Sequence, residues 1–204
     1  MTSILKVDTI QDADGNNIIN ESSNTITIGA SGDTITIPAG ATITNSGTAT
    51  GFGGITMADQ YRVTANITAN ADPISSNIER IDTSGQGTIG SAMSVSSGVF
   101  TFPSTGIYLV TFQGTGYTAS GGDNVNMSMS VTTNNSSYTT VDSQAEGNSE
   151  TRNFSLSGGS LIDVTDTSNV KVRFSVGSID SGSQFDGNTE QNRTAFTFIR
   201  LGDT

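Results

Sequence analysis

Short runs in which apolar and polar residues alternate recur from residue 61 to residue 201 of the chain. Glycine, asparagine and serine separate the runs, and none of them has the 3.6-residue period of a helix. Alternation of this kind is typical of β-strands. The predicted strands are 61–69, 98–102, 106–117, 124–133, 154–164, 169–176 and 193–201. Their close spacing predicts an all-β sandwich or barrel.

The strands at 106–117 and 193–201 carry apolar residues on both faces. An outer strand of a monomeric sandwich has one polar face. A second apolar face therefore predicts that another subunit covers it. The residues expected in the core or at a trimer interface are Tyr108, Val110, Phe112, Phe196 and Phe198, and the apolar residues on the opposite faces are Ile107, Leu109, Ile199 and Leu201.

Residues 24–44 contain an internal repeat, NTITIGASG, DTITIPAG and ATITNSG. The TITI sequences begin at Thr25 and Thr34, and a shortened TIT begins at Thr42. Strands this short cannot bury a face alone, so they need neighbouring copies to stack on. We interpret 24–54 as a β-repeat stem wound from several chains and ending in a Gly-rich joint; a flexible Thr/Ser linker is the alternative.

The first 23 residues are interpreted as a segment that docks onto a particle. Their apolar residues flank a DGNN turn, which predicts a hairpin. The turn also resembles a calcium loop, but its glycine lies too early and no bidentate glutamate follows. We therefore expect no metal. The docking residues are Ile4, Leu5, Val7, Ile10, Ile18 and Ile19.

The distribution of aromatic residues separates a head from this stem. The chain has nine Phe and four Tyr. Phe52 is the single aromatic residue before residue 54, and the other twelve follow it. Large side chains are needed for a conventional core, so 55–204 is expected to form the head.

The composition argues against catalysis and nucleic-acid binding. The chain has no Cys, His or Trp, and its net charge is −11 with only 8 Lys and Arg. A Ser–His–Asp triad is impossible, and scattered cations cannot neutralise a phosphate backbone. A two-carboxylate glycosidase stays open through Asp163 with Asp166, or Glu146 with Glu150. We expect no enzyme activity, cofactor, metal or membrane insertion.

Strand alternation also predicts where a receptor would bind. If 106–117 runs away from the stem, the loops 118–123, 145–152 and 177–192 gather at the distal end. Polar side chains with a few aromatic residues suit glycan recognition. The candidate residues are Tyr117, Asp123, Glu146, Asn148, Asp180, Gln184, Phe185, Asp186 and Asn188.

The stretch VFTFPSTGIYLVTFQGTGY at 99–117 resembles the C1q-like (C1q/TNF-type) jelly-roll family, whose signature places Phe, Pro, Gly and Tyr as Phe100, Pro103, Gly106 and Tyr108 do here. The later FSLSGGSLIDVTDTSNVKVRFSV and TAFTFIRLG extend the resemblance over roughly 57–204. It implies a homotrimer of jelly rolls. A collagen stalk is missing, so the partners of animal members do not transfer.

The N-terminal portion is similar to the openings of tail fibres and other structural proteins of bacteriophages that infect marine bacteria. The combined interpretation is a trimeric tail fibre, made in the host bacterial cytoplasm and carried on the virion. Its partners would be itself, another tail or capsid protein bound through the N-terminus, and a host surface glycan or protein. The alternatives are a capsid decoration or head fibre protein and a polysaccharide depolymerase.

Overall fold

The chain forms two compact units in the computed structural model, Met1–Gly51 and Phe52–Thr204. The structure describes residues 8–11, 13, 15, 17–44, 54–119, 124–147 and 151–204, with the side chains of Asn17 and Glu21 left aside. Several residues singled out above lie outside this description: Ile4, Leu5 and Val7 of the docking segment, Asp12, Asp14 and Asn16 of its turn, Phe52 of the joint, and Asp123, Asn148 and Glu150 of the loops.

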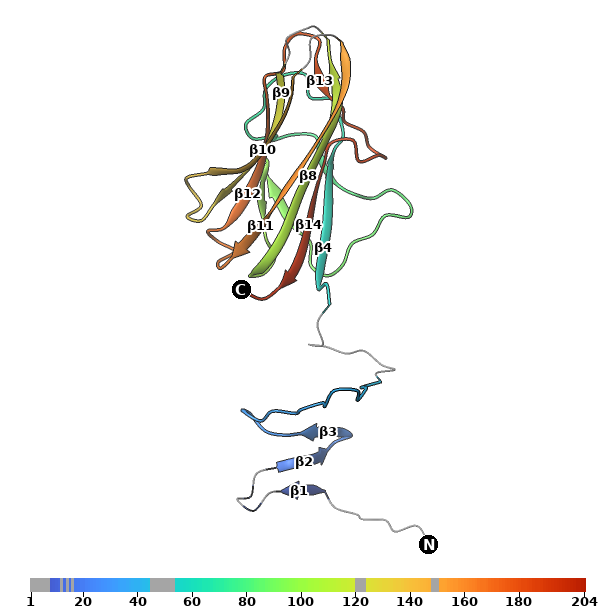
Figure 1. Ribbon diagram of the computed structural model, residues 1–204, viewed down its shortest axis with the longest axis vertical. Helices are drawn as coiled ribbons and strands as arrows, with labels where there is room; N and C mark the ends of the chain where they lie inside the picture. Colours follow the sequence, from blue (N-terminus) through green and yellow to red (C-terminus); the bar gives the residue numbers. More distant parts are fainter. Residues whose placement is uncertain are drawn as a thin grey trace. The chain divides into compact units, whose positions relative to one another are not determined.

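The first unit contains a three-stranded antiparallel sheet (Figure 1), in the order β1 (Thr9–Gln11), β2 (Asn17–Ser22) and β3 (Thr25–Ile28). The hairpin predicted around the DGNN turn is present as the β1–β2 pair. Ser23 and Asn24 connect β2 to β3, and both have positive φ angles, 53° and 64°. Two positive φ values are typical of the tight hairpin turn that matches strand twist.

The three repeats of TIT are not equivalent within one chain. The first repeat forms β3, whose four residues are all exposed. The second and third repeats, at 34–37 and 42–44, form no strand. Ile35, Ile37 and Ile43 are exposed with them. The single chain therefore gives the later repeats neither a strand partner nor a buried face.

The second unit is a sandwich of two antiparallel sheets with the orders β10–β9–β12–β7–β6 and β11–β8–β14–β4–β5, and the short β13 pairs with β8 (Figure 1). The strands are β4 (Met57–Val63), β5 (Ile78–Arg80), β6 (Ser94–Ser96), β7 (Val99–Thr101), β8 (Gly106–Thr118), β9 (Asn124–Thr132), β10 (Thr139–Gly147), β11 (Arg152–Val164), β12 (Lys171–Gly177), β13 (Gln184–Phe185) and β14 (Ala195–Gly202).

Each of the seven predicted runs corresponds to a strand, and for one of them the bounds are shifted along the chain. The run predicted at 61–69 is β4, which begins at Met57 and ends at Val63. Strand β10 was not predicted, because its sequence TTVDSQAEG is polar on both faces. It lies at the edge of its sheet, paired with β9 alone, where water reaches both faces. Strands β5, β6 and β13 are two or three residues long and leave no periodic signal.

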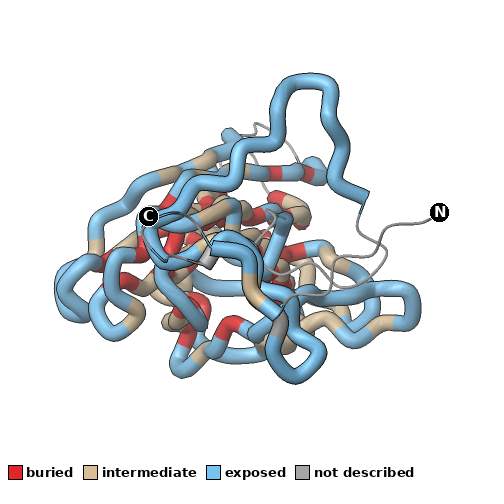
Figure 2. Tube along the Cα trace, turned by 90° about the horizontal axis from the view of Figure 1, so that it is seen from below, coloured by how far each residue is buried: buried red, intermediate tan, exposed pale blue. Residues whose placement is uncertain are grey.

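The core lies between the two sheets and is rich in aromatic rings. Figure 2 shows the buried stretches of the chain in red. Phe174 stacks on Phe196 with ring centroids 4.1 Å apart, and Phe100 packs against Phe198 at 5.0 Å. All five residues predicted for the core or the interface are in this core: Tyr108, Val110, Phe112, Phe196 and Phe198.

A buried arginine fixes the long connection after β5. The Arg62 side chain is fully buried, and its Nε donates to Glu79 at 2.7 Å. Its other nitrogens donate to Asp82, Thr83 and Gln86. Each of the three guanidinium nitrogens therefore has an acceptor in the segment 79–86, as a buried charge requires. The sequence offered no signal for this role, since Arg62 lies within an ordinary strand pattern.

Candidate functional site

The chain enters the head at the end where β14 finishes. The guanidinium of Arg200 donates from Nε to the Thr105 carbonyl at 2.9 Å and contacts the Thr56 hydroxyl at 3.4 Å. Thr56 directly precedes β4, and Thr105 directly precedes β8. The start of β8 therefore lies beside the point at which the N-terminal segment joins the head.

Three loops meet at the far end of β8. The Ala119 amide donates to Ser183 Oγ at 2.9 Å, and Thr151 Oγ1 donates to the Ala119 carbonyl at 2.7 Å. Strand β8 has 13 residues, which at a rise of ~3.3 Å per residue spans about 40 Å. The described ends of the three loops, Ala119, Thr151 and Ser183, therefore lie at the end of β8 remote from Thr56 and Thr105.

Several of the candidate receptor residues that the structure describes lie in strands or are bonded to other residues of the head. Tyr117, Glu146 and Gln184 lie in β8, β10 and β13. Asp186 accepts from Gln184 Nε2 at 2.8 Å and pairs with Arg193 at 3.2 Å. The side-chain oxygen of Asn188 accepts from two backbone amides, those of Glu190 and Gln191, both at 2.8 Å. Asp180 is exposed. The side chains of Gln184, Asp186 and Asn188 therefore hold the fold.

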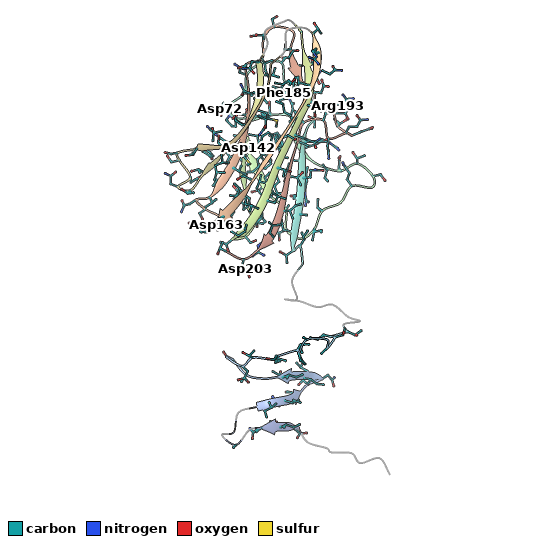
Figure 3. The ribbon with its side chains drawn as sticks, in the orientation of Figure 1. Asp72, Asp142, Asp163, Phe185, Arg193 and Asp203 are labelled. Carbon is teal, nitrogen blue, oxygen red and sulfur yellow. The ribbon has the colours of Figure 1, made fainter. Side chains whose placement is uncertain are left out.

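Phe185 was wrongly predicted to be an exposed receptor contact. Its exposed fraction is 0%, and its ring packs against Phe154 with centroids 4.8 Å apart. Phe185 is labelled in Figure 3. The backbone of Phe185 pairs with Ile67 through two hydrogen bonds, 2.9 and 3.0 Å long. The polar residues around this single ring in SQFDGN indicate an exposed loop. In the structure, the short strand β13 turns the ring inward.

The outward face of the β11–β8–β14–β4 sheet carries a row of apolar residues, defined here as the apolar row. Leu161 lies opposite Leu109, and Leu109 lies opposite Ile199. Ala58 of β4 lies opposite Ile199 and is bridged to Ile89. Leu161 is 62% exposed and Ile89 is 49% exposed. Directly opposed residues of an antiparallel sheet share a face, so the row is continuous.

A polar row and a hollow adjoin the apolar row. Thr111 of β8 lies opposite Gly159 and Thr197, and the Gln60 side chain donates to Thr197 Oγ1 at 2.7 Å. The successive glycines Gly158 and Gly159 leave a hollow of about 390 Å³ over the neighbouring side chains. The sheet face thus combines exposed apolar side chains with a recess, as in an interface between subunits.

Of the two carboxylate pairs weighed for glycosidase activity, Asp163 and Asp166 lie within the described residues, whereas Glu150 of the other pair does not. Asp166 accepts from the Ser168 amide at 2.7 Å and from Asn169 Nδ2 at 2.6 Å. These bonds, that of Ser168 first, lower the pKa of Asp166 below its ordinary value. A raised pKa is what a general acid needs. Asp163 is exposed on β11.

No group of three or more acidic residues is placed to hold a metal ion in the described part. No helix there is long and apolar enough to cross a membrane.

Solved structures with the same fold are found, whereas neither a protein-family model nor a curated protein sequence matches the chain. Structures of murine APRIL are similar at a TM-score of 0.50, with 8% to 11% identity over 71% of this chain and 98% to 99% of theirs. Eiger TNF from S. frugiperda is similar at 0.52, with 13% identity over 74% of this chain and 96% of that one. The head is a TNF-like jelly roll, which confirms the expected fold.

Proposed function

We propose that the chain is a homotrimeric virion fibre subunit, a tail fibre whose jelly-roll head attaches to the host cell surface. The observation that carries the proposal is the apolar row. Leu109, Leu161 and Ile199 are outward-facing apolar residues on a sheet that the single chain leaves uncovered. Exposed apolar patches of this kind mark sites of association. The C1q/TNF-type resemblance implies three copies.

The stem supports assembly independently. Its isoleucines at 26, 28, 35, 37 and 43 are exposed in the single chain. Covering them on neighbouring copies would bury apolar surface worth ~25 cal/mol per Å². Winding of several chains is therefore the arrangement that stabilises the stem.

The chain enters the head at one end and the three loops lie at the other, an arrangement that suits display on a particle. The joining segment reaches the head beside Thr56, and the loops at Ala119, Thr151 and Ser183 lie at the other end of β8. A subunit anchored through its N-terminus would therefore present this loop end and the flanks of the head to the outside. Several weak identical sites on one trimer would bind with avidity.

The experiment that tests the proposal locates the protein on virus particles. Gold-labelled antibodies against residues 55–204 should decorate tail tips in electron micrographs, and purified full-length protein should compete with particles for adsorption to host cells. Decoration of the capsid without competition would point instead to a head fibre or decoration protein. Absence of label from particles would overturn the virion assignment.

A further inference from the structure

The second sheet of the head has a polar groove on its outward face. The groove has a volume of about 520 Å³ and runs over β9, β10 and β12, within the range of ~300–1,000 Å³ typical of small-molecule sites. This sheet packs against the other through the core. The groove therefore faces away from the apolar row.

Among the described residues that line the groove, Arg173 of β12 is the only one with a cationic side chain. It is held in place before any ligand binds. Its guanidinium carbon lies 4.3 Å from the centre of the Tyr138 ring. Its NH2 group lies 3.3 Å from Asp72 Oδ1 (labelled in Figure 3). Stacking and pairing fix the plane of the guanidinium fork. A fixed fork loses little entropy when it donates hydrogen bonds.

One hydrogen-bond donor of Arg173 has no acceptor. Its Nε atom is buried, and it makes no hydrogen bond in the described structure. Leaving a buried donor unpaired is costly, and buried polar groups normally have a partner. The guanidinium of Arg173 therefore has a hydrogen-bond donor left over for an oxygen acceptor.

Hydroxyl and amide groups surround this arginine. Ser130 and Thr140 share a hydrogen bond of 3.1 Å, and Ser175 Oγ donates to Asp72 at 2.6 Å. Ser128 and Asn70 add a further hydroxyl and amide to the lining. Groups that both donate and accept match the alternating donors and acceptors of sugar hydroxyls.

The charge of the groove favours an uncharged ligand. Arg173 and Asp72 carry the formal charges of its lining and cancel each other. The whole chain carries a net charge of −11, which repels an anionic polymer over about a Debye length. An acidic glycan would meet this repulsion without a compensating excess of cations.

We propose that the groove lined by Arg173, Asp72 and Ser128 binds a neutral, hydroxyl-rich saccharide. Asp72 accepts from a sugar hydroxyl while the Arg173 fork donates to sugar oxygens. This inference rests on the proposed attachment function and moves the receptor site from the distal loops to the flank of the head. Three copies on one trimer would bind a repeating surface glycan with avidity.

The test probes the full-length protein with sugars fixed to a surface. The probes are neutral oligosaccharides of glucose, galactose, mannose and N-acetylglucosamine, with a galacturonic acid tetrasaccharide as the acidic comparison. Wild type should be retained by at least one neutral probe. Ser128→Tyr should abolish retention, because the ring fills the groove while tyrosine suits a strand. Ser96→Tyr is the matched control, exposed on β6 of the same sheet outside the groove, and should bind like wild type.

A second variant guards against misfolding of the first. Arg173→Lys keeps the charge and removes Nε and the planar fork. Losing a charge-assisted hydrogen bond should weaken binding about tenfold with unchanged thermal unfolding. Retention of no neutral probe, retention of the acidic probe alone, or equal binding by Ser128→Tyr would each overturn the proposal. The labelling of virus particles tests the proposed function separately. If the protein is found on the tail but binds no neutral probe, the groove proposal is wrong and the fibre proposal stands.

Discussion

The two units of the chain solve the problem of burying apolar side chains in opposite ways. In the head, the aromatic rings from both sheets are enclosed between them; Phe100, Phe174, Phe196 and Phe198 form one cluster. In the N-terminal unit, isoleucines such as Ile26 and Ile28 are exposed on the strand that carries them. A head with its own core can fold as one chain, whereas a sheet without one depends on partners.

The difference also separates two kinds of exposed apolar residue. Those of the N-terminal unit recur with the TITI repeat, at Ile26, Ile28, Ile35 and Ile37. In the head, exposed Leu161 and Ile89 belong to the apolar row on one sheet, whereas Val141 is exposed on the other sheet. Both sets are left uncovered by the single chain. Assembly would cover both at once, which couples stem formation to head association.

Separating the two units should have the largest effect on structure. When the chain is cut at Gly53, residues 55–204 should keep the circular dichroism and cooperative melting of a β-sandwich, because the core lies within them. The isolated residues 1–54 should lose regular structure at low micromolar concentration. The separated head should also fail to join particles. A head that unfolds, or one that still incorporates, would contradict the division of roles.

Removing a buried ring should destabilise the head strongly. Tyr108→Ala and Phe185→Ala should each lower the free energy of unfolding by about 3–5 kcal/mol, the cost typical of aromatic truncation in a core. Denaturant unfolding of the separated head measures this. Tyr108→Phe is the control: it keeps the ring and loses the hydrogen bond to the Ser104 carbonyl, which costs about 1 kcal/mol. If Phe185→Ala were as stable as wild type, the burial of Phe185 in the core would be contradicted.

The sequence alone predicted the sandwich because alternation survives in the strands that face the core. It could not predict β10, because both faces of that strand are polar and exposed to solvent. It could not predict β13 either, because a strand of two residues shows no alternation around Phe185. The hydrogen bonds of Arg62 join it to residues far along the chain, such as Glu79. The groove at Arg173 likewise combines distant residues, such as Asp72 and Ser128, which only the strand pairing brings together. The exposed face at Leu109 was predictable because its strand is apolar on both sides.

A charge placed in the apolar row should dissociate the assembly while sparing the fold. Leu161→Glu puts a carboxylate at a position 62% exposed in the single chain, so the jelly roll should keep its circular dichroism. The mass in solution should fall from three chains to one. Val141→Glu is the matched control, since Val141 is an exposed apolar residue of β10 on the other sheet. Equal dissociation by both variants would show that the apolar row has no special role.

The smallest effect concerns the turn closed by Asp166. Hydrogen bonds from Ser168 and Asn169 lower the pKa of this carboxyl. A lowered folded-state pKa stabilises the fold above the ordinary Asp value of 3.8, and the contribution disappears as pH falls through the lower folded-state value. Asp166→Ala should therefore melt slightly below wild type at pH 7, and the two should converge in acid. A difference independent of pH would contradict the assignment.

The most direct test of the central claim is the mass of the full-length protein in solution. Sedimentation equilibrium at micromolar concentration should give three chains of 21.0 kDa, or about 63 kDa, because the apolar row and the stem repeat both need partner copies. A stable species of one chain, or of two, would contradict the account.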